Sequence, residues 1–296
     1  MSEANNLLEA FNQYLIADGK SLATIESYVG DIAGFMEFIL GKGITFTGNL
    51  QRFLVTSYRK QLIEREYSVN TINKKINSLQ SFNQFLVDAG YCSEQIINLR
   101  KDKLRIASGS EKEVDIFTEQ EIDKLLFYIA DDTKVSRRDR LIVTMLLYTG
   151  VRVGELVNIK LKDVDCLSMN LRITWGKGGK QRDIPLKAEV IEAIQDYLEG
   201  DRKANKFRES DYLILTNRSG KADKDAINKL LNRIGRELHM NIFPHKFRHT
   251  FCSLLISRGI PVTTVAKLAG HAGIQTTASY YINTSSQDKK QAVDML

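Results

Sequence analysis

The sequence predicts a mainly α-helical protein of two domains, with a small antiparallel β-sheet in the second domain. Its 296 residues exceed what a single hydrophobic core usually needs. Apolar residues recur at helical spacing along most of the chain. Two neighbouring segments, residues 171–175 and 181–186, instead alternate between apolar and polar side chains as strands do.

The first hundred residues are expected to form a compact bundle of about four helices. Apolar residues recur at intervals of three and four within residues 7–15, 25–39, 50–66 and 70–89. Ser21 is a candidate N-cap for the second of these helices, and the segment 41–48 interrupts the pattern. We therefore assign residues 1–99 to a helical domain.

The helical spacing stops at residues 100–112, where Ser108, Gly109 and Ser110 supply the composition of a flexible linker. We place the domain boundary in this segment and assign residues 113–296 to the second domain. The linker carries a cluster of four basic residues, Arg100, Lys101, Lys103 and Arg105. These side chains either clamp a phosphate backbone or form the solvated surface of a linker, and the sequence favours neither interpretation.

Helix signals recur through the second domain. Thr118 and Glu121 form a capping-box pattern ahead of an apolar helix. A further helix at residues 140–148 is expected to end at Gly150, and helical spacing returns from Asp225 onward.

The expected sheet lies between these helices. The glycines of residues 176–180 suit a tight hairpin that joins the two alternating segments. Residues 212–216 are a candidate third strand. The second domain is therefore predicted to be mostly helical with a small antiparallel sheet.

Composition places the chain among soluble globular proteins. Hydrophobic residues make up 43% and charged residues 26%, which excludes a disordered or fibrous chain. No apolar run reaches the roughly 18 residues of a membrane span, and residues 1–10 lack a secretory signal pattern. We therefore expect a cytoplasmic protein with no membrane association. The formal net charge of +6 weakly favours a polyanionic partner.

The patterns that bind metals are weak in this sequence. The three cysteines, Cys92, Cys166 and Cys252, are far apart and form no CxxC pair, which argues against a disulfide framework or a cysteine-based zinc site. His245 and His249 are four residues apart, as zinc ligands on a helix can be, but no HExxH glutamate accompanies them. We expect neither a metal ion nor another cofactor.

Three pairs of polar residues interrupt apolar segments at spacings that suit a shared site. In two of the pairs the residues are three apart and would share a helix face. For any single pair, a salt bridge within the helix or another structural contact is the simpler explanation. Their occurrence together in one chain favours a chemical role. The pairs are Arg152 with Glu155, His245 with Arg248, and His271 with Tyr280 nine residues later.

Five motifs follow one another along the chain: an RxxE helix start, a GKGxK segment, an HxxRH helix, an AGH turn and a tyrosine nine residues beyond it. In this order they resemble the tyrosine recombinase, or integrase, family, and most closely its short Xer-type members. The resemblance covers nearly the whole chain. In the first domain, two segments look like the core-binding domain of that family. Their candidate DNA contacts are Lys20, Thr24, Tyr28, Thr71, Lys74 and Lys75.

The resemblance implies a role for each matched residue. Two arginines hold the scissile phosphate, a lysine lies on a mobile β-hairpin, two histidines line the pocket, a tyrosine is the nucleophile and an acidic residue supports the first arginine. The two arginines are Arg152 and Arg248, the lysine is Lys177, and the two histidines are His245 and His271. The nucleophile is Tyr280, and the acidic residue is Glu155. Lys180 and Tyr281 are the near alternatives to Lys177 and Tyr280. Adjacent helical residues point about 100° apart, so only one of the two tyrosines can face a given pocket. The nine-residue spacing from His271 selects Tyr280.

The chemistry of these side chains fits strand transfer at a phosphodiester. Two permanently charged guanidiniums can donate paired hydrogen bonds to the oxygens that gain charge, which replaces the work of a metal ion. A tyrosine hydroxyl with a pKa of about 10 needs a base, for which His245 is the favoured acceptor, and Lys177 can protonate the departing sugar oxygen. Because attack by tyrosine preserves a phosphoester as a protein–DNA link, rejoining needs no ATP.

The resemblance also implies an assembly. It implies a C-shaped clamp on double-stranded DNA, a 3′-phosphotyrosine link and a Holliday junction within a homotetramer. The substrate is expected to be an inverted-repeat core site, bound by this chain alone or together with a paralogous recombinase. A type IB topoisomerase and an inactive DNA-binding regulator of the same fold are the alternatives. The short Xer-like arrangement of the chain disfavours the topoisomerase. The presence of all six catalytic residue types disfavours the inactive regulator.

Overall fold

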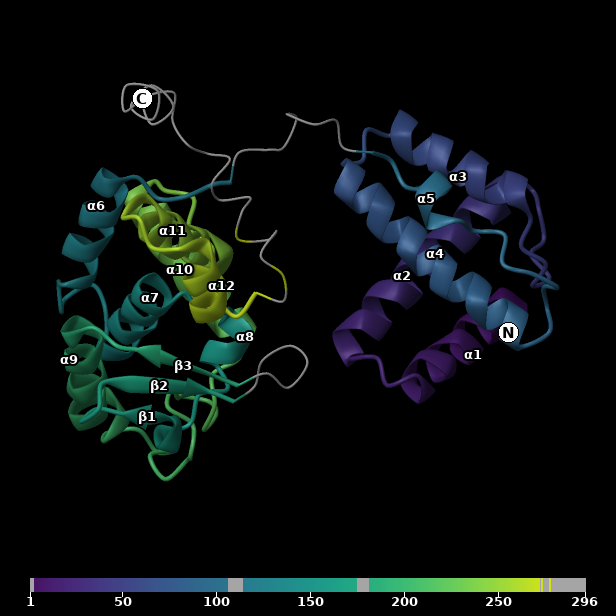
Figure 1. Cartoon of the computed structure of the whole chain (residues 1–296). Coiled ribbons are helices and arrows are strands. Elements are labelled where there is room, and N and C mark those ends of the chain that lie inside the picture. The colour runs from purple at the N-terminus through teal and green to yellow at the C-terminus, as the bar shows by residue number, and fades with distance from the viewer. Residues whose placement is uncertain (1–2, 106–113, 175–180, 272, 274–276, 278–296) are drawn as a thin grey trace, which may run out of the picture. The chain divides into compact units, whose positions relative to one another are not determined.

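The computed structural model describes residues 3–105, 114–174, 181–271, 273 and 277. The chain divides into two compact units, Met1–Glu111 and Lys112–Leu296 (Figure 1). Each unit has its own core of buried apolar side chains. Among the described residues, no helix is both long enough and apolar enough to cross a membrane.

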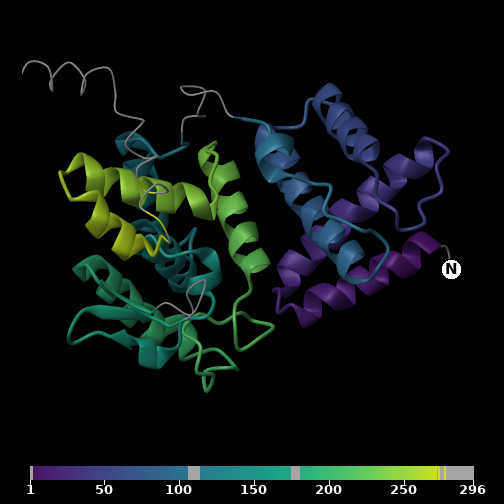
Figure 2. The ribbon, with the colours of Figure 1, turned by 45° about the vertical axis from the view of Figure 1, so that its right-hand side comes forward.

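Unit 1 is a bundle of helices (Figure 2). Its apolar core includes several aromatic side chains. Ser21 caps the second helix by accepting a hydrogen bond from the backbone N–H of Thr24, in the position that the sequence predicts. The buried rings of Phe11 and Phe82 meet edge to face, with centroids 5.1 Å apart. The helices are α1 (Glu3–Ala17), α2 (Leu22–Gly41), α3 (Arg52–Glu64), α4 (Val69–Asp88) and the short α5 (Leu99–Asp102).

The start of the basic segment is packed onto unit 1. The buried carboxylate of Asp102 in α5 pairs with Arg52 of α3. Farther along, Asn73 of α4 accepts a hydrogen bond from the backbone N–H of Leu104 (2.8 Å) and donates one to its carbonyl (3.0 Å). Residues 100–104, which the sequence analysis assigns to the linker, are therefore held by α3 and α4.

Unit 2 is mostly helical and contains one small sheet (Figure 1). Its α-helices are α6 (Glu119–Ile129), α7 (Arg137–Thr149), α8 (Val153–Leu156), α9 (Ala188–Tyr197), α10 (Lys224–Leu238), α11 (Pro244–Ser257) and α12 (Val262–Ala269). Two shorter helical turns are η1 (Leu161–Asp163) and η2 (Leu198–Arg202). The strands are β1 (Val164–Asp165), β2 (Asn170–Ile173) and β3 (Arg182–Pro185). The predicted fold class, mainly helical with a small antiparallel sheet, is confirmed.

The sheet has the order β1-β2-β3 with antiparallel neighbours. The two expected alternating segments form β2 and β3, with Leu171 opposite Ile184 and both side chains buried. The prediction of a third strand at residues 212–216 is wrong, because β1 occupies the edge beside β2. Tyr212 forms only an isolated bridge with Lys160 in the described residues. The burial of this segment comes from packing as a loop against the core.

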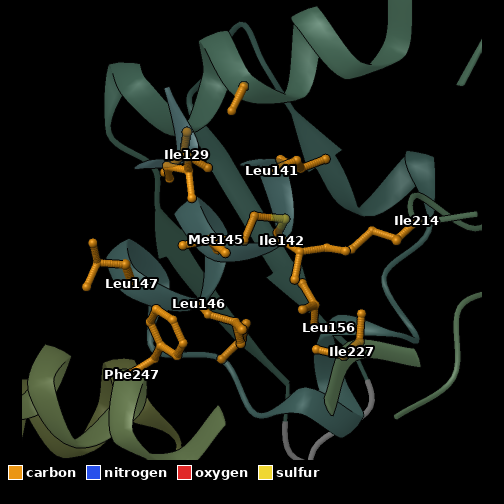
Figure 3. Close-up of a cluster of buried hydrophobic side chains, with 14 of the residues drawn as sticks. Ile129, Leu141, Ile142, Met145, Leu146, Leu147, Leu156, Ile214, Ile227 and Phe247 are labelled. Atoms are coloured by element: carbon orange, nitrogen blue, oxygen red, sulfur yellow. The ribbon is translucent and has the colours of Figure 1, made fainter. Parts of the chain in front are cut away.

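Helix α7 runs through the middle of the unit 2 core. Every residue from 141 to 147 is buried, and all but Thr144 are apolar, as expected for a helix segment enclosed on all sides. Figure 3 shows side chains of α7 against Leu156 of α8, Ile227 of α10 and Phe247 of α11. Helices α8 and α11 therefore both pack against α7. Both of these helices bear predicted site residues.

Candidate active site

The turn between α7 and α8 carries the first arginine of the site. Gly150 ends α7 in the left-handed conformation, with a φ of 59°, and a Cβ at this position would lie 2.3 Å from Cδ1 of Phe251. The turn therefore requires glycine. Arg152 follows as the N-cap of α8. Glu155 accepts hydrogen bonds from the backbone N–H of Arg152 (2.9 Å) and from its Nη1 (2.8 Å).

The second arginine, Arg248, is buried in α11, which begins with Pro244. Its Nη1 donates to the carbonyl of Gly150 (2.7 Å), and its Nη2 donates to the carbonyl of Ala269. Burial, followed by the nearby charge of Arg152, lowers the pKa of Arg248 to about 10. The guanidinium is still charged at pH 7, and neither carbonyl neutralises it.

The C-terminus of α12 gathers three guanidiniums. The last carbonyls of a helix have no partner inside the helix and form the negative end of its dipole. Here the carbonyls of Leu268, Ala269 and Gly270 each accept a hydrogen bond from an arginine. Nε of Arg182 donates to Leu268 (2.8 Å), Nη2 of Arg248 donates to Ala269, and Nη2 of Arg152 donates to Gly270 (2.8 Å).

Two histidines belong to the same cluster. His245 is exposed, but displacement of water from its inner side, followed by the guanidiniums of Arg248 and Arg152, lowers its pKa. Burial, followed by the same two guanidiniums, lowers the pKa of His271 to about 4. The His271 Nδ1 lies 2.7 Å from the hydroxyl of Thr277. Both imidazoles are therefore mainly neutral at pH 7.

Glu155 lies between two arginines. Its side chain is 4% exposed, and Nη1 and Nη2 of Arg182 donate to its two oxygens at 3.0 and 2.7 Å. Burial alone would raise the pKa of this carboxyl, but hydrogen bonds from Arg182 and from the backbone N–H of Arg152 hold the pKa below its ordinary value. The carboxylate is charged at neutral pH and fixes both guanidiniums.

The sequence analysis did not identify Arg182. This residue opens β3 just after a glycine- and lysine-rich stretch, where one more cation looks like part of a basic surface loop. Its side chain is nevertheless only 11% exposed. No local pattern marks it, because its partners Glu155 and Leu268 are distant in the sequence.

The structure brings together four of the six predicted catalytic residues, namely Arg152, His245, Arg248 and His271, with Glu155 beside them. Lys177 and Tyr280 lie outside the described residues, as do their near alternatives Lys180 and Tyr281.

The predicted DNA contacts of the first domain have varied environments. Lys20 pairs with Asp18 at 2.8 Å, whereas Lys74 and Lys75 both pair with the buried carboxylate of Asp31 at 3.1 Å. The remaining three candidates are partly buried, as Lys75 is. Thr24 and Thr71 contact the N-cap serines of α2 and α4, and Tyr28 is partly buried against the core.

The four basic residues of the predicted linker lie at the end of unit 1. Arg100 and Lys101 are on α5, and both are exposed, as is Arg105. Lys103, the C-cap of α5, is partly buried.

Two imidazoles of α11 lie near each other, with the ring centroids of His245 and His249 6.0 Å apart. The His249 Nδ1 is 3.4 Å from the carbonyl of Asp115. Within the described part of the chain, no group of three or more histidine, cysteine, aspartate or glutamate side chains could hold a metal ion.

Known proteins match the chain over nearly its full length. Residues 115–288 match the phage integrase family, and residues 8–90 match the phage integrase N-terminal SAM-like domain. The TnP I resolvase of Bacillus thuringiensis is 31% identical over 299 residues, covering 98% of this chain and 100% of the relative. Tyrosine recombinase XerA of Pyrococcus furiosus is 31% identical over 294 residues, covering 98% and 93%.

Solved structures share the fold. XerH recombinase in a post-cleavage complex with a palindromic difH substrate has a TM-score of 0.77 at 20% identity, covering 93% of this chain and 81% of that one. The Tn1549 transposon integrase in complex with a circular intermediate DNA has a TM-score of 0.71 at 18% identity, covering 98% and 99%. With the motifs, the two matching domains and these relatives together, the chain belongs to the phage integrase family of tyrosine recombinases.

Proposed function

We propose that this recombinase cleaves and rejoins double-stranded DNA at a specific site through a covalent 3′-phosphotyrosine link to Tyr280. The observation that carries the proposal is the cluster of Arg152 and Arg248 with His245 and His271. Bonds to other described residues use one N–H on each Nη of the two arginines. Since a guanidinium has five N–H donors, each arginine retains three for the oxygens of a phosphate.

The proposed step is an in-line exchange at phosphorus. The Tyr280 oxygen attacks, the bond from phosphorus to the 5′ oxygen breaks, and the guanidiniums stabilise the charge that gathers on the non-bridging oxygens. Neutral His245 accepts the phenolic proton, and Lys177 protonates the departing 5′ oxygen. Rejoining is the same step in reverse with a 5′ hydroxyl as the nucleophile. Neither a metal ion nor ATP enters the scheme.

The proposed substrate is a core site with inverted repeats, held by a clamp formed from both units. Residues 1–99 would serve as the core-binding domain, residues 100–112 as a basic linker whose first residues pack on unit 1, and residues 113–296 as the catalytic domain. Proteins of the same fold support a DNA partner, because XerH is bound to a palindromic difH substrate and the Tn1549 integrase to a circular intermediate DNA. We propose a homotetramer on DNA, or a mixed tetramer with a paralogous recombinase.

A nicked suicide substrate tests the nucleophile. The wild-type chain should form a covalent complex that survives denaturing gels, whereas Tyr280→Phe should bind DNA without forming it. Tyr281→Phe is the matched control and should retain the covalent band. A band that persists in Tyr280→Phe and disappears in Tyr281→Phe would assign the role to Tyr281.

Chelation tests the absence of a metal ion from the reaction. Cleavage should proceed in excess EDTA, because two arginines supply the charge stabilisation that divalent ions supply in nucleases. If chelation abolishes cleavage and magnesium or zinc restores it, the metal-free scheme is wrong. His245 and His249 would then become the candidate ligands.

A further inference from the structure

We propose that Arg182 is a positioning residue for the strand-transfer reaction, which orients Arg152 through Glu155 and fixes the C-terminus of α12 ahead of His271. This inference rests on the proposed function. It adds a third arginine, carried by β3, to the two that the motifs identify. Arg182 acts through its neighbours and not on the phosphate.

The first argument comes from the hydrogen bonds of Glu155. An ionised carboxylate accepts about four hydrogen bonds. Arg152 supplies two of them, from its backbone N–H and its Nη1, and Arg182 supplies the other two from Nη1 and Nη2. The fork of Arg182 therefore holds the carboxylate in the one orientation that also serves Arg152. Without it, Glu155 would be a buried carboxylate with half of its partners missing.

The second argument comes from the end of α12. Arg182 Nε donates to the carbonyl of Leu268 at 2.8 Å. Its guanidinium also lies against Gly270, where a Cβ would be 2.7 Å from Nη1 of Arg182. Gly270 has a φ of 67° and leads directly into His271. One side chain thus connects β3 both to Glu155 of α8 and to the turn that leads into His271.

The third argument is electrostatic. Glu155 and Arg152 alone form a pair with no net charge, whereas Glu155 with both arginines carries one positive charge. Arg182 therefore allows Glu155 to orient Arg152 without cancelling the charge that Arg152 offers to a phosphate. The Arg182 side chain is only 11% exposed, so it lies beneath the surface.

The test compares Arg182→Gln and Arg182→Lys with Arg172→Gln as the matched control. Arg172 is on the adjacent strand β2 and makes an exposed ion pair with Asp183, so it controls for loss of an arginine from this sheet. In single-turnover assays with the suicide substrate, Arg182→Gln should form the covalent complex about 10- to 100-fold more slowly. Its affinity for DNA should stay close to that of wild type, because phosphate contacts across the whole site supply most of that affinity, and Arg182→Lys should recover part of the rate.

A double-mutant cycle separates positioning from general damage to the fold. If Arg182 orients Arg152 through Glu155, its loss should cost less rate in a Glu155→Gln background than in wild type, because only the contact with the α12 turn then remains to be lost. Removing both charges also avoids an unpaired buried carboxylate, so Glu155→Gln/Arg182→Gln tests the idea even if Arg182→Gln alone unfolds. Additive losses in rate, or full activity in Arg182→Gln, would overturn the inference.

A readout independent of cleavage distinguishes this inference from the proposed function. Arg182 is one of the cations that lower the pKa of His271, after burial, Arg248 and Arg152. NMR titration of the imidazoles should therefore show that the pKa of His271 rises in Arg182→Gln and stays unchanged in Arg172→Gln. If wild type forms no covalent complex, the proposed function fails while this titration still decides on Arg182. An unchanged His271 titration would contradict the contact with the α12 turn.

Discussion

Arg248 is held by two backbone carbonyls, and this choice of partner matters for its charge. A carboxylate would orient the guanidinium but also neutralise it, whereas the carbonyls of Gly150 and Ala269 orient it and leave the charge in place. The cost is visible in the pKa of about 10, which burial and Arg152 impose. A phosphate that enters the site would relieve this cost, so binding and charge stabilisation are linked at this residue.

Lys177→Ala should fail mainly at protonation of the leaving oxygen. A substrate whose bridging 5′ oxygen is replaced by sulfur departs without a proton, so it should restore much of the lost cleavage rate. Lys180→Ala is the matched control and should show neither the loss nor the rescue. If Lys180→Ala is the variant that sulfur rescues, the general acid is displaced by three residues from Lys177.

Stability should fall as the pH drops from about 6.5 toward 4. Burial, followed by nearby guanidiniums, lowers the pKa of His271 to about 4, so below its ordinary value the unfolded chain binds a proton that the folded chain resists. The contribution is fully present above pH 6.5 and is lost on acidification. Urea midpoints at pH 7.5 and pH 5 measure this effect. His271→Gln should reduce the drop, whereas His239→Asn at an exposed position should not.

Helices α7 and α12 each end in a glycine with left-handed backbone conformation, and the carbonyl of that glycine accepts a hydrogen bond from an arginine. Helix α7 ends at Gly150 and presents that carbonyl to Arg248, while α12 ends at Gly270 and presents its carbonyl to Arg152. The site is therefore built where helices stop. The residues that allow them to stop are as necessary as the residues that bind.

Gly150→Ala should destabilise unit 2 and slow cleavage. The left-handed conformation costs a non-glycine residue about 1 kcal/mol, and the new Cβ would meet Phe251 at 2.3 Å, which adds an overpacking cost of about 1–3 kcal/mol. Gly259→Ala is the matched control, because Gly259 has a φ of 80° with no heavy atom within 4 Å of an added Cβ. Chemical denaturation that gives equal losses for both variants would contradict the proposed clash.

Periodicity was sufficient to predict most helices but not every element. The apolar run of α7 and the capping box at Thr118 are local signals, and both lie where the sequence places them. Strand β1 has only two residues, too few to show alternation. Arg182 was missed for a related reason, since its partners Glu155 and Leu268 are 27 and 86 residues away. Contacts of that range are made by the tertiary fold and leave no local pattern.

The two units divide the predicted functions between them. Every described residue of the candidate active site lies in unit 2, whereas the predicted DNA contacts from Lys20 to Arg105 lie in unit 1. Each unit has a separate core, so a change in one core need not disturb the other. Substitutions in the two units should therefore separate DNA affinity from chemistry.

Unit 2 also has a cavity of about 510 Å³ with a mainly apolar lining. Its apolar lining includes Leu147, Phe251, Leu254, Leu255 and Leu268, and four charged residues also line it: Glu119, Asp123, Lys187 and Arg258. The final residues of the chain, which lie outside the described residues, include an apolar set at helical spacing: Ala292, Val293 and Leu296. Thr284 or Ser285 can cap such a helix.

We predict that this C-terminal segment docks in trans, in the cavity of a neighbouring subunit. A helix of two to three turns is marginal alone in water and needs a surface to pack against, and a head-to-tail contact closes a ring when it is repeated around DNA. Truncation after Ser286 should therefore leave binding to a single site nearly intact but weaken tetramer formation and recombination, as native gels and recombination assays would measure. Leu255→Glu in the cavity should weaken assembly in the same way, because it blocks the receiving surface. A truncated chain that assembles and recombines like the full chain, or that unfolds, would assign the segment to its own subunit.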